Sequence, residues 1–218
     1  MNKGLVITLP RWDNVTEYLS QFSDQILREA DDKGVKYKTL DGKDANKANF
    51  EKVVNNLDYN FVVFNGHGSP SSIKGHKNEV LVEVGDNEHL LKGRIVYARA
   101  CEAGVVLGKS CIEKDKNGCF IGYSFPFVFW ADREWDSVPQ KDEIARLFLE
   151  PSNMVPISFI KGHTAGEAHK NSKLHILKSL KKEIKRNTKD TPLIVEGLLN
   201  NYYGQVLLGN DDASLNVV

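Results

Sequence analysis

Short apolar runs alternate along this chain with longer segments whose apolar residues recur every three or four positions. The apolar runs cover residues 4–9, 35–40, 60–64, 94–98, 119–123 and 205–208. Continuous runs of this kind are typical of strands that are covered on both faces, as in a parallel sheet. A further short strand is expected at 79–84.

The segments between the runs have the periodicity of amphipathic helices. Helices are predicted from about 14 to 27, from 43 to 56, after the strand at 94–98, from 142 to 149 and from 164 to about 185. Asp13 or Asn14 can cap the first helix, and Gly34 follows as a stop signal. The inward face of the last helix is expected to carry Ala168, Leu174, Leu177, Leu180 and Ile184. Strands that alternate with helices predict an α/β fold with a mostly parallel sheet, in one domain over residues 1–218.

Charge and cysteine content narrow the class of protein. The 29 basic and 29 acidic residues cancel, so nothing in the net charge favours nucleic acid or an anionic membrane as a partner. The longest uncharged stretch, 117–131, is too short to span a bilayer, and the N-terminal apolar run is too short for a secretory signal. Three cysteines are too few for a disulfide scaffold, which favours a cytoplasmic setting with free thiols. The histidines and cysteines lack metal-site spacing, and no metal or cofactor is predicted.

Two side chains suited to nucleophilic catalysis follow consecutive core strands. His67 lies between two glycines after the run 60–64, and Cys101 follows the run 94–98. Because sites in parallel sheets form at the carboxyl ends of strands, we expect these two side chains to share a crevice. An imidazole can take the proton of a thiol and later protonate a leaving amine. The N–H groups of Gly68 and Cys101 can then hold the oxyanion, which together predicts a Cys-His dyad for acyl transfer.

The same residues carry a resemblance to a known family. The segment 61–69, FVVFNGHGS, resembles the strand and His-Gly block of the caspase-like cysteine peptidases, and 95–104, IVYARACEAG, resembles their strand and Ala-Cys block. The second block is most similar in form to the CHAT-type and gingipain-like branch. Weaker similarities lie at 164–168 and at 207–211, where the Asp-Pro of gingipain-like domains is replaced.

The resemblance implies a caspase-like three-layer α/β/α sandwich and the activity of a cysteine endopeptidase. It implies that His67 is the general base and acid, that Cys101 is the nucleophile, and that Gly68 and Cys101 form the oxyanion hole. The substrate would be a protein or peptide, and an activating protein partner stays open. No third acidic residue is required by the family pattern.

Two arginines suggest the specificity of such a peptidase. The residue two before the nucleophile lines the specificity pocket in several relatives, and here it is Arg99. Arg11 follows the first strand, where caspases also place a pocket arginine. Two guanidinium groups in one pocket would favour a carboxylate and therefore cleavage after an acidic residue. An alternative pocket for Lys or Arg could be formed by Asp13, Asp41, Asp132 and Asp136.

Further alternatives concern the aromatic segment 125–135 and the class of protein. Trp130 is expected either to wall the substrate cleft, as the corresponding loop does in relatives, or to lie in a core or interface. The chain could instead be an inactive or regulatory caspase-like module that binds a protein partner in the same cleft. A flavodoxin-like ligand-binding domain is disfavoured, because 10–13 lacks the small residues of a phosphate cradle.

Overall fold

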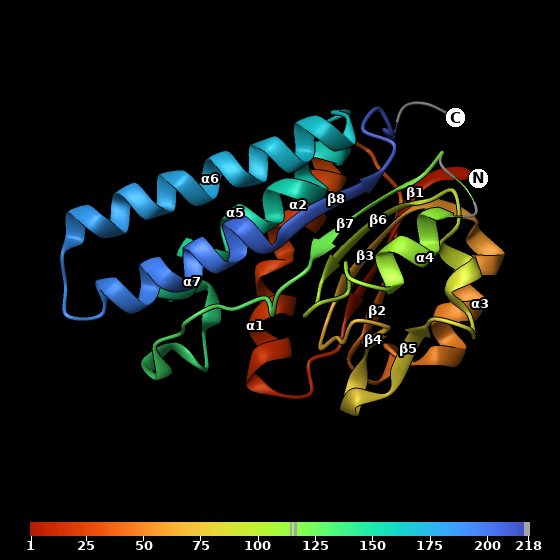
Figure 1. Cartoon of the computed structure of the whole chain (residues 1–218). Helices are drawn as coiled ribbons and strands as arrows, with labels where there is room; N and C mark the ends of the chain where they lie inside the picture. Colours follow the sequence, from red (N-terminus) through yellow and green to blue (C-terminus); the bar gives the residue numbers. More distant parts are fainter. Residues whose placement is uncertain (114, 116, 216–218) are drawn as a thin grey trace.

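A six-stranded sheet forms the centre of the protein in a computed structural model, which describes residues 1–113, 115 and 117–215. The strand order is β2-β1-β3-β6-β7-β8 (Figure 1). These strands are β1 (Asn2–Leu9), β2 (Tyr37–Asp41), β3 (Tyr59–Asn65), β6 (Ile95–Arg99), β7 (Cys119–Tyr123) and β8 (Gln205–Gly209). Neighbouring strands are parallel except for β8, which pairs antiparallel with β7. The prediction of an α/β fold with a mostly parallel sheet is therefore confirmed.

Helices cover both faces of this sheet. They are α1 (Asn14–Phe22), α2 (Asp24–Asp32), α3 (Lys47–Leu57), α4 (Leu107–Glu113), α5 (Glu143–Ile160), α6 (Ala165–Arg186) and α7 (Thr191–Gly204). Successive residues of a strand point to opposite faces, so Phe61 and Val63 pack toward α2 and α5, whereas Val62 and Phe64 pack toward α3 and α4. Two separate hydrophobic cores result, one on each side of the sheet. None of the described helices combines the length and apolar character needed to cross a membrane.

Several elements differ from the sequence prediction. The helix expected at 14–27 is broken at Ser23, whose hydroxyl donates to the Leu19 carbonyl at 2.8 Å, so that α1 and α2 are separate. Helix α5 does not end at residue 149 but continues through Pro151 and Pro156, since most of its last three turns is buried. Helix α7 was not predicted, because its apolar residues do not form a single stripe. A short strand, β4 (Ser72–Lys74), pairs with the predicted β5 (Val80–Glu83).

The buried face of α6 also differs from the expected one. Leu174, Leu177 and Ile184 are exposed, although the sequence places them inward. Ala168 and Leu180 are buried as predicted, and the other buried positions are Ala165, Ser172, Ile176 and Glu183. Helices α6 and α7 extend side by side beyond the sheet (Figure 1), so α6 packs against α5 and α7 over much of its length. The partner helices, and not the sheet, decide which face of α6 is covered.

Candidate functional site

His67 and Cys101 follow two neighbouring strands at the carboxyl edge of the sheet. Strands β3 and β6 are neighbours, and their register pairs Asn65 with Arg99, two residues before His67 and Cys101 respectively. The backbones then meet at Gly68, where an added Cβ would lie 2.6 Å from the Cys101 carbonyl oxygen and 3.1 Å from its nitrogen. Only glycine allows this approach. The expectation that the two loops form one site is therefore consistent with the observed geometry.

The His67 imidazole has a carboxylate partner from a third strand. Its Nε2 lies 2.7 Å from Oδ2 of Asp13, which follows β1 and caps α1 through a bond from the Thr16 N–H at 2.8 Å. Within the described part of the chain Nδ1 has no hydrogen-bond partner. An ionised Asp13 accepts the Nε2 proton, which leaves the lone pair on Nδ1 free to accept another.

Asp13 is well suited to remain ionised. Burial raises the pKa of its carboxyl, but hydrogen bonds from the Thr16 backbone and from His67 outweigh burial, and the pKa lies below the ordinary 3.8. The Asp13 side chain is 28 % exposed and that of His67 is 34 % exposed, so both are reachable from solvent. At neutral pH Asp13 is therefore a carboxylate that holds the His67 ring in one orientation.

Cys101 is partly exposed and has a protonated thiol at rest. Burial raises the pKa of its thiol, and the charge of Glu102 raises it further. The sulfur donates to the Phe127 carbonyl at 3.8 Å, and no hydrogen bond joins it to His67 in the described structure. The thiol must therefore rotate away from Phe127 before it can give its proton to the imidazole.

Two backbone N–H groups where Gly68 meets Cys101 are available to a ligand. Neither the Gly68 N–H nor the Cys101 N–H donates to another described residue. Glu102, directly after the cysteine, has a left-handed backbone with φ of 55°, which is strained for a non-glycine residue. Its N–H donates to the Phe125 carbonyl at 3.3 Å, which holds the turn in place. This geometry is suited to an oxyanion that develops next to the sulfur.

The other two cysteines are not reactive candidates. Cys111 and Cys119 are both 0 % exposed, and burial raises the pKa of each thiol to about 12. Each packs in one of the two hydrophobic cores. Their role is packing, as the sequence suggests.

Arg99 does not lie where the sequence analysis expects it. The side chain is 0 % exposed, so it is closed off from a substrate. Its five N–H groups make hydrogen bonds of 2.6–2.9 Å to neutral acceptors on Asn65, Ser152, Asn153, Leu19 and Ser23. Helices α1, α2 and α5 close over the end of β6 and bury the guanidinium. Arg99 is therefore a structural residue that ties the two site strands to these helices.

Arg11 is also occupied by partners within the protein. Its Nε donates to Asp41 at 2.8 Å and its Nη1 donates to Glu17 at 2.9 Å. These carboxylates neutralise the guanidinium, and Arg99 lies in the interior, so the two arginines do not converge on one pocket. The prediction of cleavage after an acidic residue required both arginines to face the substrate, so it has no support in this arrangement. Two of the four carboxylates of the alternative pocket are also engaged, since Asp41 pairs with Arg11 and Asp13 with His67.

Trp130 lines a different depression of the surface. It contributes with Asp132, Ile144, Asp190 and Leu193 to a cavity of about 470 Å³ whose lining includes neither His67 nor Cys101. The indole Nε1 would lie 3.1 Å from a Cβ added at Gly197, so the ring rests against α7. The expectation that Trp130 walls the cleft at the dyad is not supported by this placement.

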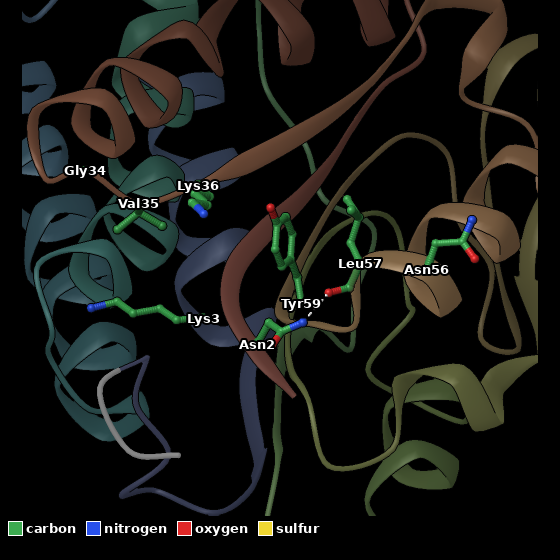
Figure 2. Close-up of a pocket in the computed structure, with 8 residues that line it drawn as sticks. All are labelled: Asn2, Lys3, Gly34, Val35, Lys36, Asn56, Leu57 and Tyr59. Carbon is green, nitrogen blue, oxygen red and sulfur yellow. Dashed lines mark hydrogen bonds between the residues drawn. The ribbon is translucent and has the colours of Figure 1, made fainter.

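A second cavity lies far from the candidate site. It has a volume of about 590 Å³ and is lined by residues at the amino ends of β1 and β3 and at the ends of α2 and α3 (Figure 2). Among these residues are Asn2, Lys36 and Tyr59, with the Asn2 amide bonded to the Leu57 carbonyl (Figure 2). Because it opens at the opposite edge of the sheet from Cys101, it plays no part in the site.

The contacts of Asp13 and Trp12 with His67 are not predicted by the sequence. It predicts Asp13 as a helix cap and as part of an alternative pocket, and assigns Trp12 no role in the site. Trp12 is 37 % exposed, and its ring centroid lies 6.3 Å from that of His67 at an angle of 71°. The signal available in the sequence was their position directly after a strand, but strand order was needed to place them beside His67.

Comparison with known proteins adds no family to these observations. No protein-family model matches the chain, and no curated protein is detectably similar to it. The assignment of function therefore depends on the geometry of the site.

Proposed function

We propose that this protein is a cysteine endopeptidase with a caspase-like α/β/α fold, in which Cys101 is the nucleophile and His67 the general base and acid. The observation that carries the proposal is the meeting of His67, held by Asp13, with the partly exposed Cys101 across the Gly68 contact. The three layers and the position of these residues after two neighbouring strands agree with the fold that the resemblance implies.

The chemistry follows from the atoms of the site. Rotation of the thiol away from Phe127 brings the Cys101 proton to Nδ1 of His67, and the thiolate attacks the carbonyl carbon of a peptide bond. The oxyanion accepts hydrogen bonds from the N–H groups of Gly68 and Cys101. The imidazolium then protonates the leaving amine, and a thioester with Cys101 remains. Water attacks the thioester while His67 takes its proton, which releases the acid and restores the thiol.

Asp13 contributes to this sequence as a positioning residue. Its carboxylate accepts the Nε2 proton and so selects the tautomer in which Nδ1 can act as base. It also stabilises the imidazolium that exists between the two proton transfers. This role departs from the family pattern in the sequence analysis, which required no acidic partner.

Thiol labelling combined with peptide cleavage tests the proposal. Iodoacetamide is expected to give one fast adduct on native protein, mapped by mass spectrometry to Cys101 and slowed in His67→Ala. A peptide mixture from digested proteins should be cleaved by the wild type and by Cys111→Ala. Cys101→Ala should lose about 1,000-fold or more in rate, since the nucleophile is removed.

The outcomes separate the candidate functions. Equal and slow labelling of all three cysteines would show that Cys101 is not activated and would reject catalysis. Fast labelling of Cys101 without cleavage of any peptide would favour the inactive or regulatory module that binds a protein in the same cleft. Cleavage that persists in Cys101→Ala would assign the activity to a contaminant.

A further inference from the structure

The order of strands at the carboxyl edge gives the substrate a direction. From β1 through β3 and β6 to β7, the edge presents Trp12 and Asp13, then His67, then Cys101, then Phe127. A peptide whose scissile bond lies at Cys101 therefore has the β1 turn on one side and the segment after β7 on the other. This arrangement, together with the proposed peptidase function, is the starting point for the inference.

The proton path decides which half of the substrate lies toward β1. In the proposed reaction His67 protonates the nitrogen of the leaving amine, so this nitrogen must lie next to the imidazole. The acyl half stays on the Cys101 sulfur. The residue directly after the scissile bond is consequently on the His67 side of the sulfur, where the exposed Trp12 ring meets the imidazole edge.

The turn that carries Trp12 is held rigidly. The Trp12 N–H donates to the Thr16 hydroxyl at 3.0 Å, and His76 Nδ1 bonds to the Pro10 carbonyl at 2.8 Å. Arg11 has a left-handed backbone with φ of 45°, and its two ion pairs anchor this strained residue to β2 and to α1. A large ring carried on a backbone that is already held has few torsions left to order, so it loses little conformational entropy when a ligand packs on it.

We infer that Trp12 forms the subsite for the residue immediately after the scissile bond and makes the peptidase prefer a large apolar or aromatic residue there. The inference rests on the proposed function and adds its substrate class. The exposed indole of Trp12 offers apolar surface and a face for ring stacking to a large substrate residue after the scissile bond. A substrate glycine there would leave the indole in water. Arg11, which the sequence suggests as a substrate ligand, here supports the neighbouring residue that contacts the substrate.

Paired peptides measure this preference directly. Quenched fluorescent peptides are made with one sequence before the bond, taken from the cleavage sites of the wild type, and with Phe or Gly after it. We expect kcat/KM for the Phe peptide to exceed that for the Gly peptide by about fivefold to tenfold in the wild type. The ratio should approach one in Trp12→Ala and stay high in Trp12→Phe. Tyr203→Ala, which removes an exposed ring on α7, is the matched control and should keep the wild-type ratio.

A second readout separates substrate binding from support of His67. The rate of Cys101 alkylation by iodoacetamide, and its pH profile, should be the same in Trp12→Ala as in the wild type. The subsite would be overturned if the wild type cleaved the Phe and Gly peptides at equal rates, or if Trp12→Ala kept the preference for Phe. It would also be overturned if Trp12→Ala lost the same factor on both peptides and its Cys101 were alkylated more slowly. Absence of any Cys101-dependent cleavage would instead overturn the peptidase proposal, and the subsite with it.

Discussion

Replacement of Arg99 tests whether its charge belongs to the protein interior or to a substrate pocket. The guanidinium is fully buried and gives all five N–H groups to neutral acceptors. Two of these acceptors, the amide oxygens of Asn65 and Asn153, have no other donor in the described part of the chain. Arg99→Met keeps much of the volume but leaves both oxygens without a partner.

The loss of stability expected for Arg99→Met follows from these two unpaired oxygen atoms. Each buried acceptor without a partner costs about 1–3 kcal/mol, so the two oxygens cost about 2–6 kcal/mol. Removal of the buried charge offsets part of this cost. We expect Arg99→Met to lower the free energy of unfolding by about 3 kcal/mol. Arg99→Lys keeps a buried charge but has only three donors without the planar fork, and should be destabilised at least as much.

Urea denaturation followed by tryptophan fluorescence and far-UV circular dichroism measures the change. For an m-value of about 2–3 kcal/mol/M, a loss of about 3 kcal/mol lowers the midpoint by about 1–1.5 M. Arg28→Met, at an exposed position of α2, is the matched control and should change the unfolding free energy by less than about 0.5 kcal/mol.

The opposite result would refute the reasoning. A midpoint of Arg99→Met or Arg99→Lys within about 0.3 M of the wild type would mean that the hydrogen bonds of Arg99 are not needed for stability. If such a variant also changed which peptide bond is cleaved, the pocket role suggested by the sequence would be restored.

Three further changes probe the site itself. Asp13→Asn keeps a cap acceptor but removes the charge, so kcat/KM at neutral pH should fall about 10–100-fold. The pKa of Asp13 is lower in the folded protein than in the unfolded chain, so the stability that its ionised carboxylate contributes is present above pH 3.8 and is lost as the pH falls through the folded value. The free energies of unfolding of the wild type and Asp13→Asn, measured in urea, should therefore converge at lower pH. Glu102→Gln removes a charge that raises the pKa of the Cys101 thiol, so the pH midpoint of alkylation should move down, and an unchanged midpoint would contradict that effect. Gly68→Ala places a Cβ 2.6 Å from the Cys101 carbonyl oxygen, which should destabilise the protein by about 1–3 kcal/mol in thermal unfolding and abolish most peptide cleavage.

The strands of the parallel sheet and the position of His67 and Cys101 at their ends could be predicted from the sequence. A strand buried on both faces has a continuous apolar run, and this signal is local. The prediction that the two residues share an edge needed only the tendency of consecutive strands to be neighbours, which holds for β3 and β6. The helix cap at Asp13 is likewise a local pattern, and the structure confirms it.

Tertiary structure alone decided which partner each polar side chain has. Asp13 and His67 are 54 residues apart, and their contact exists because β1 lies beside β3. Because Arg99 lies two residues before Cys101 in the sequence, it is predicted to line the specificity pocket, but α1, α2 and α5 close over its side chain. The exposed leucines of α6 show the same limit, since the neighbouring helices select the buried face. A periodic pattern of apolar residues indicates that one face of a helix or strand is buried. Which other element buries it depends on packing between segments that are distant in the chain.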